Sequence, residues 1–188
     1  MSRTLALTGM PGAGKSTVGR IVADRLGRHF IDVDAEVEQA LGKPISTVVA
    51  EAGIAYFREY EHQMLRRVLR HDDLVVGLGG GAVMRDANVA ELLLTGVLVH
   101  LDVPLATLVQ RITADPDQVS ARPLLAGDPH GAVEALTRLH DERDQRYREV
   151  AEAVVDGSGR PEDVAEAILA WAREAGDVLT PSEHEVTM

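Results

Sequence analysis

The segment LALTGMPGAGKS, residues 5–16, decides the fold of this chain. Residues 5–7 form a short apolar run of the kind that becomes a buried strand, and this run leads directly into a glycine-rich loop. Residues 9–16 match the pattern G-x-x-x-x-G-K-[S/T], and residues 15–26 then carry apolar side chains at helical spacing. A strand before the pattern and a helix after it are the context in which such a loop binds phosphate.

The residue types in this loop fit that chemistry. Glycines allow successive backbone N–H groups to converge on phosphate oxygens, and the N-terminus of the following helix adds favourable dipole charge. We expect Lys15 to reach the β- and γ-phosphates of a nucleotide and Ser16 to offer its hydroxyl to Mg²⁺. Chance would give such a match in on the order of one chain in a hundred. The loop alone does not determine what happens to the phosphate.

Extended and helical patterns alternate along the rest of the chain. Strands are predicted at residues 5–7, 30–33, 74–78, 97–101 and 153–155, and helices at 15–26, 34–41, 44–52, 55–70, 86–94, 104–114, 132–150 and 161–175. This alternation is typical of an α/β protein in which helices flank a central parallel sheet on both faces. Ligands of such sheets bind outside the carboxyl ends of the strands.

Length and composition exclude several classes of protein. At 188 residues one domain is expected over residues 1–176, followed by a polar tail at 177–188 that we expect to be disordered. The net charge of −11 argues against nucleic acid and against anionic membrane surfaces as partners. The absence of cysteine excludes disulfides, thiolate catalysis and cysteine-bound zinc. Without a long apolar run or a signal-peptide pattern, a cytoplasmic protein is expected.

The histidines give no sign of a metal site in the sequence. They do not show metal-ligand spacing such as H-E-x-x-H, so we expect them to be structural or exposed. These residues are His29, His62, His71, His100, His130, His140 and His184.

Two carboxylates follow the second predicted strand. Asp32 and Asp34 are two residues apart, and in an extended segment such residues point to the same face. One could hold Mg²⁺ directly or through water, and the other could accept a proton from an incoming hydroxyl. Alternatively, Asp34 caps the helix that follows, which is a favoured place for aspartate, or it does both.

Several arginines and a run of glycines lie farther along the chain. Arg58 falls in a predicted helix and by itself would be interpreted as a solvated arginine. Gly79–Gly81 ends a predicted strand, where glycines permit close approach of a ligand or form an ordinary turn. Arg122 lies in an aperiodic segment, residues 115–130, long enough to be a functional lid. On closure of such a lid its arginine can reach a transferring phosphate.

The order of these features resembles shikimate kinase. Phe57-Arg58, the three glycines, Arg122-Pro123-Leu124-Leu125 and then Glu142-Arg143 with Tyr147 occur in the sequence typical of that family, and the resemblance spans roughly residues 3–172. It implies a three-layer P-loop kinase fold, similar to nucleoside-monophosphate kinases, with a flexible lid at 115–130 and substrate-binding helices at 34–70. It also implies ATP- and Mg²⁺-dependent phosphorylation of the 3-hydroxyl of shikimate, a step towards chorismate and the aromatic amino acids.

The resemblance also implies roles for individual residues. Lys15, Asp34 and Arg122 would be catalytic, with Asp34 as the partner of the reacting hydroxyl and Arg122 closing over the phosphates. ATP would contact Gly12, Ala13, Gly14, Lys15, Ser16, Thr17, Arg111 and Arg122, with Arg111 against the adenine. Shikimate would be held by Asp34, Arg58, Gly80, Gly81 and Arg143. Ser16 would bind the magnesium ion, and Asp32 would do so through water.

The chain departs from the family pattern at two places. Gln145 stands where family members often have a proline between the helix arginine and the tyrosine, and the lid is longer than usual and more acidic, through Asp115, Asp117 and Asp128. The alternatives are a gluconate or nucleoside-monophosphate kinase of the same fold, and a non-catalytic nucleotide-binding module. A nucleotide kinase would need an arginine-rich lid, and here only Arg122 is present. We expect a monomer whose partners are small-molecule substrates.

Overall fold

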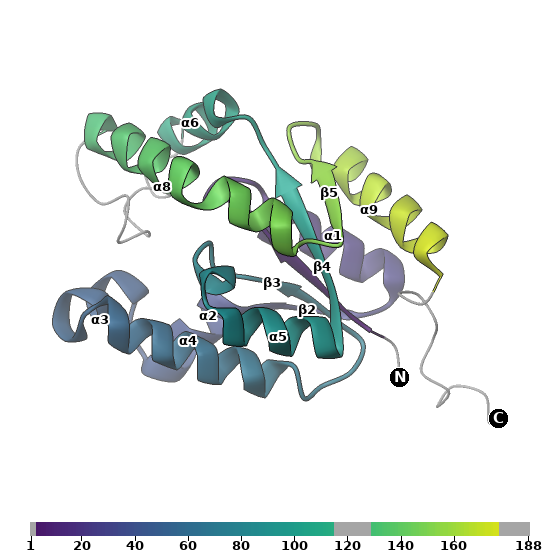
Figure 1. Ribbon diagram of the computed structural model, residues 1–188, viewed down its shortest axis with the longest axis horizontal. Helices are drawn as coiled ribbons and strands as arrows, with labels where there is room; N and C mark the ends of the chain where they lie inside the picture. Colours follow the sequence, from purple (N-terminus) through teal and green to yellow (C-terminus); the bar gives the residue numbers. More distant parts are fainter. Residues whose placement is uncertain (1–2, 115–128, 177–188) are drawn as a thin grey trace.

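The computed structural model describes residues 3–114 and 129–176, and its centre is a five-stranded parallel sheet (Figure 1). The strands are β1 (Thr4–Thr8), β2 (His29–Asp32), β3 (Leu74–Gly77), β4 (Gly96–Asp102) and β5 (Ala153–Asp156). Their order across the sheet is β2-β3-β1-β4-β5, and all neighbouring pairs are parallel. The predicted α/β fold with a central parallel sheet is confirmed.

Helices cover both faces of this sheet. They are α1 (Lys15–Leu26), α2 (Val33–Leu41), α3 (Ile45–Ala52), α4 (Ile54–Val68), α5 (Asp86–Thr95), α6 (Leu105–Thr113), α8 (Pro129–Val150) and α9 (Pro161–Ala175), with a short 3₁₀ helix η1 (Ala82–Met84). In Figure 1, α5 and α8 lie in front of the sheet, whereas α1, which packs against α9, lies behind it. None of the helices in the described ranges is long and apolar enough to cross a membrane.

The burial of the strands follows from these layers. Every residue of β1 and β3 is buried, because helices remove both faces of the central strands from water. The edge strand β5 instead alternates between partly buried and exposed side chains. Central strands therefore appear as continuous apolar runs in the sequence, which is why they could be predicted from short segments.

Several boundaries differ from those predicted. The predicted strand at 30–33 ends at Asp32, because the Asp32 side chain accepts hydrogen bonds from the backbone N–H groups of Asp34 and Ala35 and so caps α2. The alternative in which Asp34 is the cap is therefore wrong. Helix α8 begins at Pro129, and η1 was not predicted. The predicted tail at 177–188 and the predicted lid, apart from its last two residues, lie outside the described residues.

The topology brings four loops to one edge of the sheet. Strands β1 and β3 are neighbours, and β2 and β4 flank them. Because all strands are parallel, the segments that follow them meet at the carboxyl edge. These segments are the glycine-rich loop after β1, the start of α2 after β2, the glycines after β3 and the end of β4.

Candidate active site

The loop between β1 and α1 has the backbone that its glycines permit. Gly12 has φ of 83° and Gly14 has φ of 91°, values in the left-handed region that side chains disfavour. Lys15 lies at the first position of α1, and its ammonium group donates to the carbonyl oxygens of Gly9 at 2.9 Å and Met10 at 3.1 Å. These contacts hold the positive charge over the loop, where the phosphates of a nucleotide would meet it.

A cavity of about 380 Å³ lies beside this loop. Its walls are residues 12–18 together with Arg111, Ile112, Gly157, Gly159, Pro161 and Val164. The Arg111 guanidinium donates to the carbonyl oxygens of Gly157 at 3.0 Å and Ser158 at 3.1 Å, so it joins α6 to the segment after β5. The volume is in the range of a small-molecule site, and its walls include Arg111 and the loop residues 12–17 that are expected to contact ATP.

Asp32 and Ser16 place oxygen atoms at the start of α1. The Ser16 hydroxyl donates to Asp32 Oδ2 at 2.5 Å, while Asp32 Oδ1 accepts the N–H of Asp34 at 3.1 Å. Asp32 thus caps one helix and contacts the beginning of another. A hydroxyl and a carboxylate next to a phosphate-binding loop are the hard oxygen ligands that Mg²⁺ takes, so the residues present fit such an ion.

Asp34 lies in the first turn of α2, with its Oδ1 atom buried and, within the described chain, without a hydrogen-bond partner. Burial raises the pKa of Asp34 to about 7, and the neighbouring carboxylates of Glu61 and Asp32 act in the same direction. Lys15 and Arg58 are close enough to oppose that rise. An acceptor oxygen without a partner, on a carboxyl group that titrates near neutral pH, is suited to receive a hydroxyl proton.

Glu61, on α4, is a member of this site that sequence reasoning missed. Its side chain is 1% exposed, and Oε2 accepts from Arg58 at 2.7 Å. Its Oε1 has no partner among the described residues, and burial raises its pKa while Arg58 lowers it. The spacing of three residues between Arg58 and Glu61 on one helix was the available signal.

The glycines after β3 allow these groups to converge. A Cβ atom on Gly79 would stand 2.5 Å from Glu61 Oε1 and 2.6 Å from Asp34 Oδ1, and one on Gly81 would stand 2.2 Å from Arg58 Nη2. Side chains therefore occupy the space that a larger residue would need. The glycines do form a turn, in which the Ala82 N–H donates to the Gly79 carbonyl oxygen at 3.0 Å, and side chains also approach two of the three closely.

Two guanidinium groups lie on either side of the same glycines. Arg58 contacts Gly81 from α4, and Arg143 donates from α8 to the Gly80 carbonyl oxygen at 3.0 Å. Tyr147 donates its hydroxyl to that same oxygen. Arg143 is 8% exposed, and Arg58 pairs with a buried carboxylate, so neither is a solvated surface arginine.

Of the two departures from the family pattern, only Gln145 lies within the described residues. Gln145 is exposed and donates to Glu149 at 2.6 Å, one turn along α8, so the missing proline leaves Arg143 within a continuous helix. Arg122 and the three lid aspartates lie outside the described residues.

The raised pKa of Asp34 predicts that this carboxyl group destabilises the folded chain relative to the unfolded chain at pH values above about 4. The unfolded chain releases the Asp34 proton near pH 4, whereas the folded chain holds it until about pH 7. Between these values folding becomes less favourable as the pH rises. We expect Asp34→Asn, measured without nucleotide and with a chelator present, to raise the melting temperature by a few degrees at pH 8. The gain should shrink as the pH is lowered towards 5, and a gain of equal size at both pH values would contradict this account.

Comparisons with known proteins agree with this geometry. A family model described as shikimate kinase matches residues 11–173. A shikimate kinase from Thermobifida fusca is 41% identical over 178 residues, which cover 94% of this chain and 99% of that protein. One from Aromatoleum aromaticum is 42% identical over 159 residues, covering 84% of this chain and 87% of that protein.

Solved structures give the same result. Shikimate kinase from Acinetobacter baumannii in complex with shikimate superposes with a TM-score of 0.86 at 33% identity, covering 94% of this chain and 96% of that one. Shikimate kinase from Bacteroides thetaiotaomicron gives 0.83 at 28% identity, covering 91% and 98%. A gluconokinase from Sinorhizobium meliloti gives 0.56 at 19% identity, covering 95% of each chain, so that likeness is one of fold alone.

Proposed function

This chain belongs to the shikimate kinase family, and from that premise we propose that it transfers the γ-phosphoryl group of ATP to the 3-hydroxyl of shikimate. The products are shikimate 3-phosphate and ADP, in the route to chorismate and the aromatic amino acids. The observation that carries the proposal is the meeting of Asp34, Arg58 and Arg143 around Gly79–Gly81, beside Lys15.

The arginines supply recognition of the substrate carboxylate. Planar guanidinium groups pair with carboxylates through two parallel hydrogen bonds, and Arg58 and Arg143 approach the Gly80–Gly81 backbone from two helices. These local positive charges offset the net charge of −11, which disfavours an anionic substrate. Asp34 and the backbone of the glycines then bind the hydroxyl groups of shikimate.

Transfer of the γ-phosphoryl group requires mainly that the two substrates are correctly positioned and that positive charge surrounds the transferred group. The transition state is loose, so its stabilisation rests on positive groups around the equatorial oxygens. Lys15 supplies one such group, and Arg122 supplies another. Asp34 orients the 3-hydroxyl and takes its proton late in the reaction.

Magnesium is the cofactor that fits the donor atoms at the start of α1. Ser16 would bind the ion directly and Asp32 through water, consistent with their mutual contact at 2.5 Å. When bound with ATP, the ion would neutralise charge on the β- and γ-phosphates. Both residues are oxygen donors only, as Mg²⁺ prefers.

The same reasoning extends to the organisation of the chain. Residues 1–176 form one kinase domain, in which residues 34–70 contribute helices to the shikimate site. The protein acts in the cytoplasm as a monomer. Its ATP site comprises residues 12–17 together with Arg111 and Arg122, and the first of these arginines stands in the wall of the cavity beside the loop.

ADP release measured with and without shikimate tests the function. We expect rapid MgATP-dependent release that requires shikimate, with gluconate and nucleoside monophosphates giving no more than the background rate. Release that does not depend on shikimate would reject the proposal. Release with gluconate alone would assign the chain to a different acceptor.

The division of roles between the two substrates is tested by the arginines. Arg58→Ala and Arg143→Ala should each raise KM for shikimate about tenfold to a hundredfold, since each removes a hydrogen bond between charged groups worth roughly 1.5–3 kcal/mol. KM for ATP should change little. Arg25→Ala, which removes an exposed ion pair with Glu166, is the matched control. An equal loss of affinity for ATP would contradict the assignment.

A further inference from the structure

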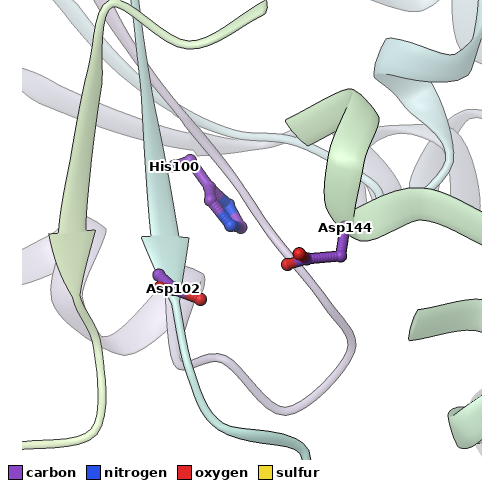
Figure 2. A group of neighbouring side chains, drawn as sticks. All are labelled: His100, Asp102 and Asp144. Carbon is purple, nitrogen blue, oxygen red and sulfur yellow. The ribbon is translucent and has the colours of Figure 1, made fainter. Parts of the chain in front are cut away.

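A cluster of possible metal ligands lies at the end of β4, outside the residues assigned to ATP and shikimate. His100 and Asp102 come from β4 and Asp144 comes from α8, and one ligand atom of each lies within 4.8 Å of the other two. Figure 2 shows the His100 ring pointing into the space between the two carboxylates. The expectation that all the histidines are structural or exposed did not anticipate this arrangement.

His100 is buried, and its ring nitrogens are poorly hydrogen-bonded. His100 is 1% exposed, and within the described residues neither ring nitrogen makes a hydrogen bond of good geometry, although the backbone of Thr8 lies close enough to interact with the ring. The ring stacks on Tyr147 at 5.1 Å between centroids, which fixes its plane without satisfying its nitrogens. A buried polar group left in this state destabilises the fold. Burial also lowers the pKa of His100 and so disfavours the charged form of the ring.

The two carboxylates are accessible and already attract a cation. Asp102 and Asp144 are 34% and 28% exposed, so the cluster has an opening to solvent. Arg148 donates to Asp102 at 2.7 Å and to Asp144 at 2.9 Å, and so offsets one of the two negative charges. Because the Arg148 side chain is itself 45% exposed, it can move away into water when another cation takes its place.

We propose that His100, Asp102 and Asp144 bind a divalent transition-metal ion such as zinc. One imidazole and two carboxylates form a three-ligand set that leaves a coordination position for water. Imidazole suits zinc and its neighbours in the first transition row, whereas Mg²⁺ prefers oxygen ligands alone. This site is therefore chemically distinct from the magnesium site at Ser16 and Asp32, and it selects a different ion.

The bound ion would tie α8 to the sheet. Asp144 lies between Arg143 and Tyr147 on that helix, and both of those residues donate to the Gly80 carbonyl oxygen. A link from Asp144 to β4 would hold this turn of α8 in place behind the glycines. The ion would take the place of Arg148, which already links α8 to β4 through Asp102. What the ion adds to this link is a bond to His100.

Zinc titration of the full chain by calorimetry, without nucleotide and with millimolar Mg²⁺ present, tests this site. We expect one zinc ion per chain at this site, with affinity at least tenfold weaker in His100→Gln and in Asp144→Asn. Arg148→Ala should bind zinc more tightly than the wild type, because the competing cation is gone. His29→Gln, at an exposed position on β2, should match the wild type.

Two results would overturn the proposal. One is the absence of zinc binding in the wild type under these conditions. The other is loss of binding in His140→Gln with normal binding in His100→Gln, since His140 also approaches Asp144, at 4.0 Å, and would then be the ligand. Thermal unfolding of each metal-free variant shows whether it folds, and Asp144→Asn tests the site without altering a buried side chain.

Discussion

Lys15→Ala should lower kcat for phosphoryl transfer about a thousandfold while leaving the fold intact. Lys15 is the charged side chain held over the phosphate loop through the Gly9 and Met10 carbonyl oxygens. Single charged groups that stabilise the transition state of phosphoryl transfer contribute effects of this size or larger. Alanine is the best helix former, so the first position of α1 should not suffer. ADP release with shikimate and MgATP, together with a thermal melt, measures both effects.

The chain provides its own control for this substitution. Its other lysine, Lys43, forms an exposed ion pair with Glu51 at 2.5 Å. Lys43→Ala removes the same charge, and it should leave kcat within about twofold of the wild type, since exposed pairs of this kind contribute little. Near-normal turnover by Lys15→Ala would show that the loop does not bind the transferred phosphate.

Asp34→Asn should lower kcat about 10²-fold to 10⁴-fold, the usual contribution of a positioned acid–base group. Asparagine keeps the size of the side chain but cannot take the proton of the 3-hydroxyl. KM for shikimate should rise much less, because the arginines still bind the carboxylate. Initial rates over a range of shikimate concentrations, at saturating MgATP, separate the two parameters.

Asp24→Asn is the matched control for Asp34→Asn, because Asp24 is exposed on α1. A change confined to KM would show that Asp34 only binds the substrate. The activity loss should accompany the gain in thermal stability expected at pH 8. A variant that is less active and more stable is the pattern of a residue kept for function at a cost in stability, whereas loss of both would indicate a disrupted fold.

Much of the fold could be predicted from local patterns. The strand, glycine loop and helix around residues 5–26 are encoded within a few neighbouring residues, and the apolar runs of β3 and β4 reflect burial on both faces. Prediction failed where a side chain competed for backbone hydrogen bonds. Asp32 ends β2 and caps α2, so Asp34 faces the site from a helix, not from the strand on which the period-two argument relied.

The residues of the site divide in the same way. The phosphate loop could be predicted from its sequence motif, because backbone groups of adjacent residues form that part of the site. The closeness of Glu61 to Asp34 and the meeting of Arg58 and Arg143 at one glycine segment depend on how α2, α4 and α8 pack around the end of β3. The cluster of His100, Asp102 and Asp144 likewise depends on α8 lying against β4. Sequence alone determined which local elements form, since their signals come from neighbouring residues. Only tertiary packing decided which distant charges share a buried space, and with it the pKa of Asp34 and the poorly hydrogen-bonded nitrogens of His100.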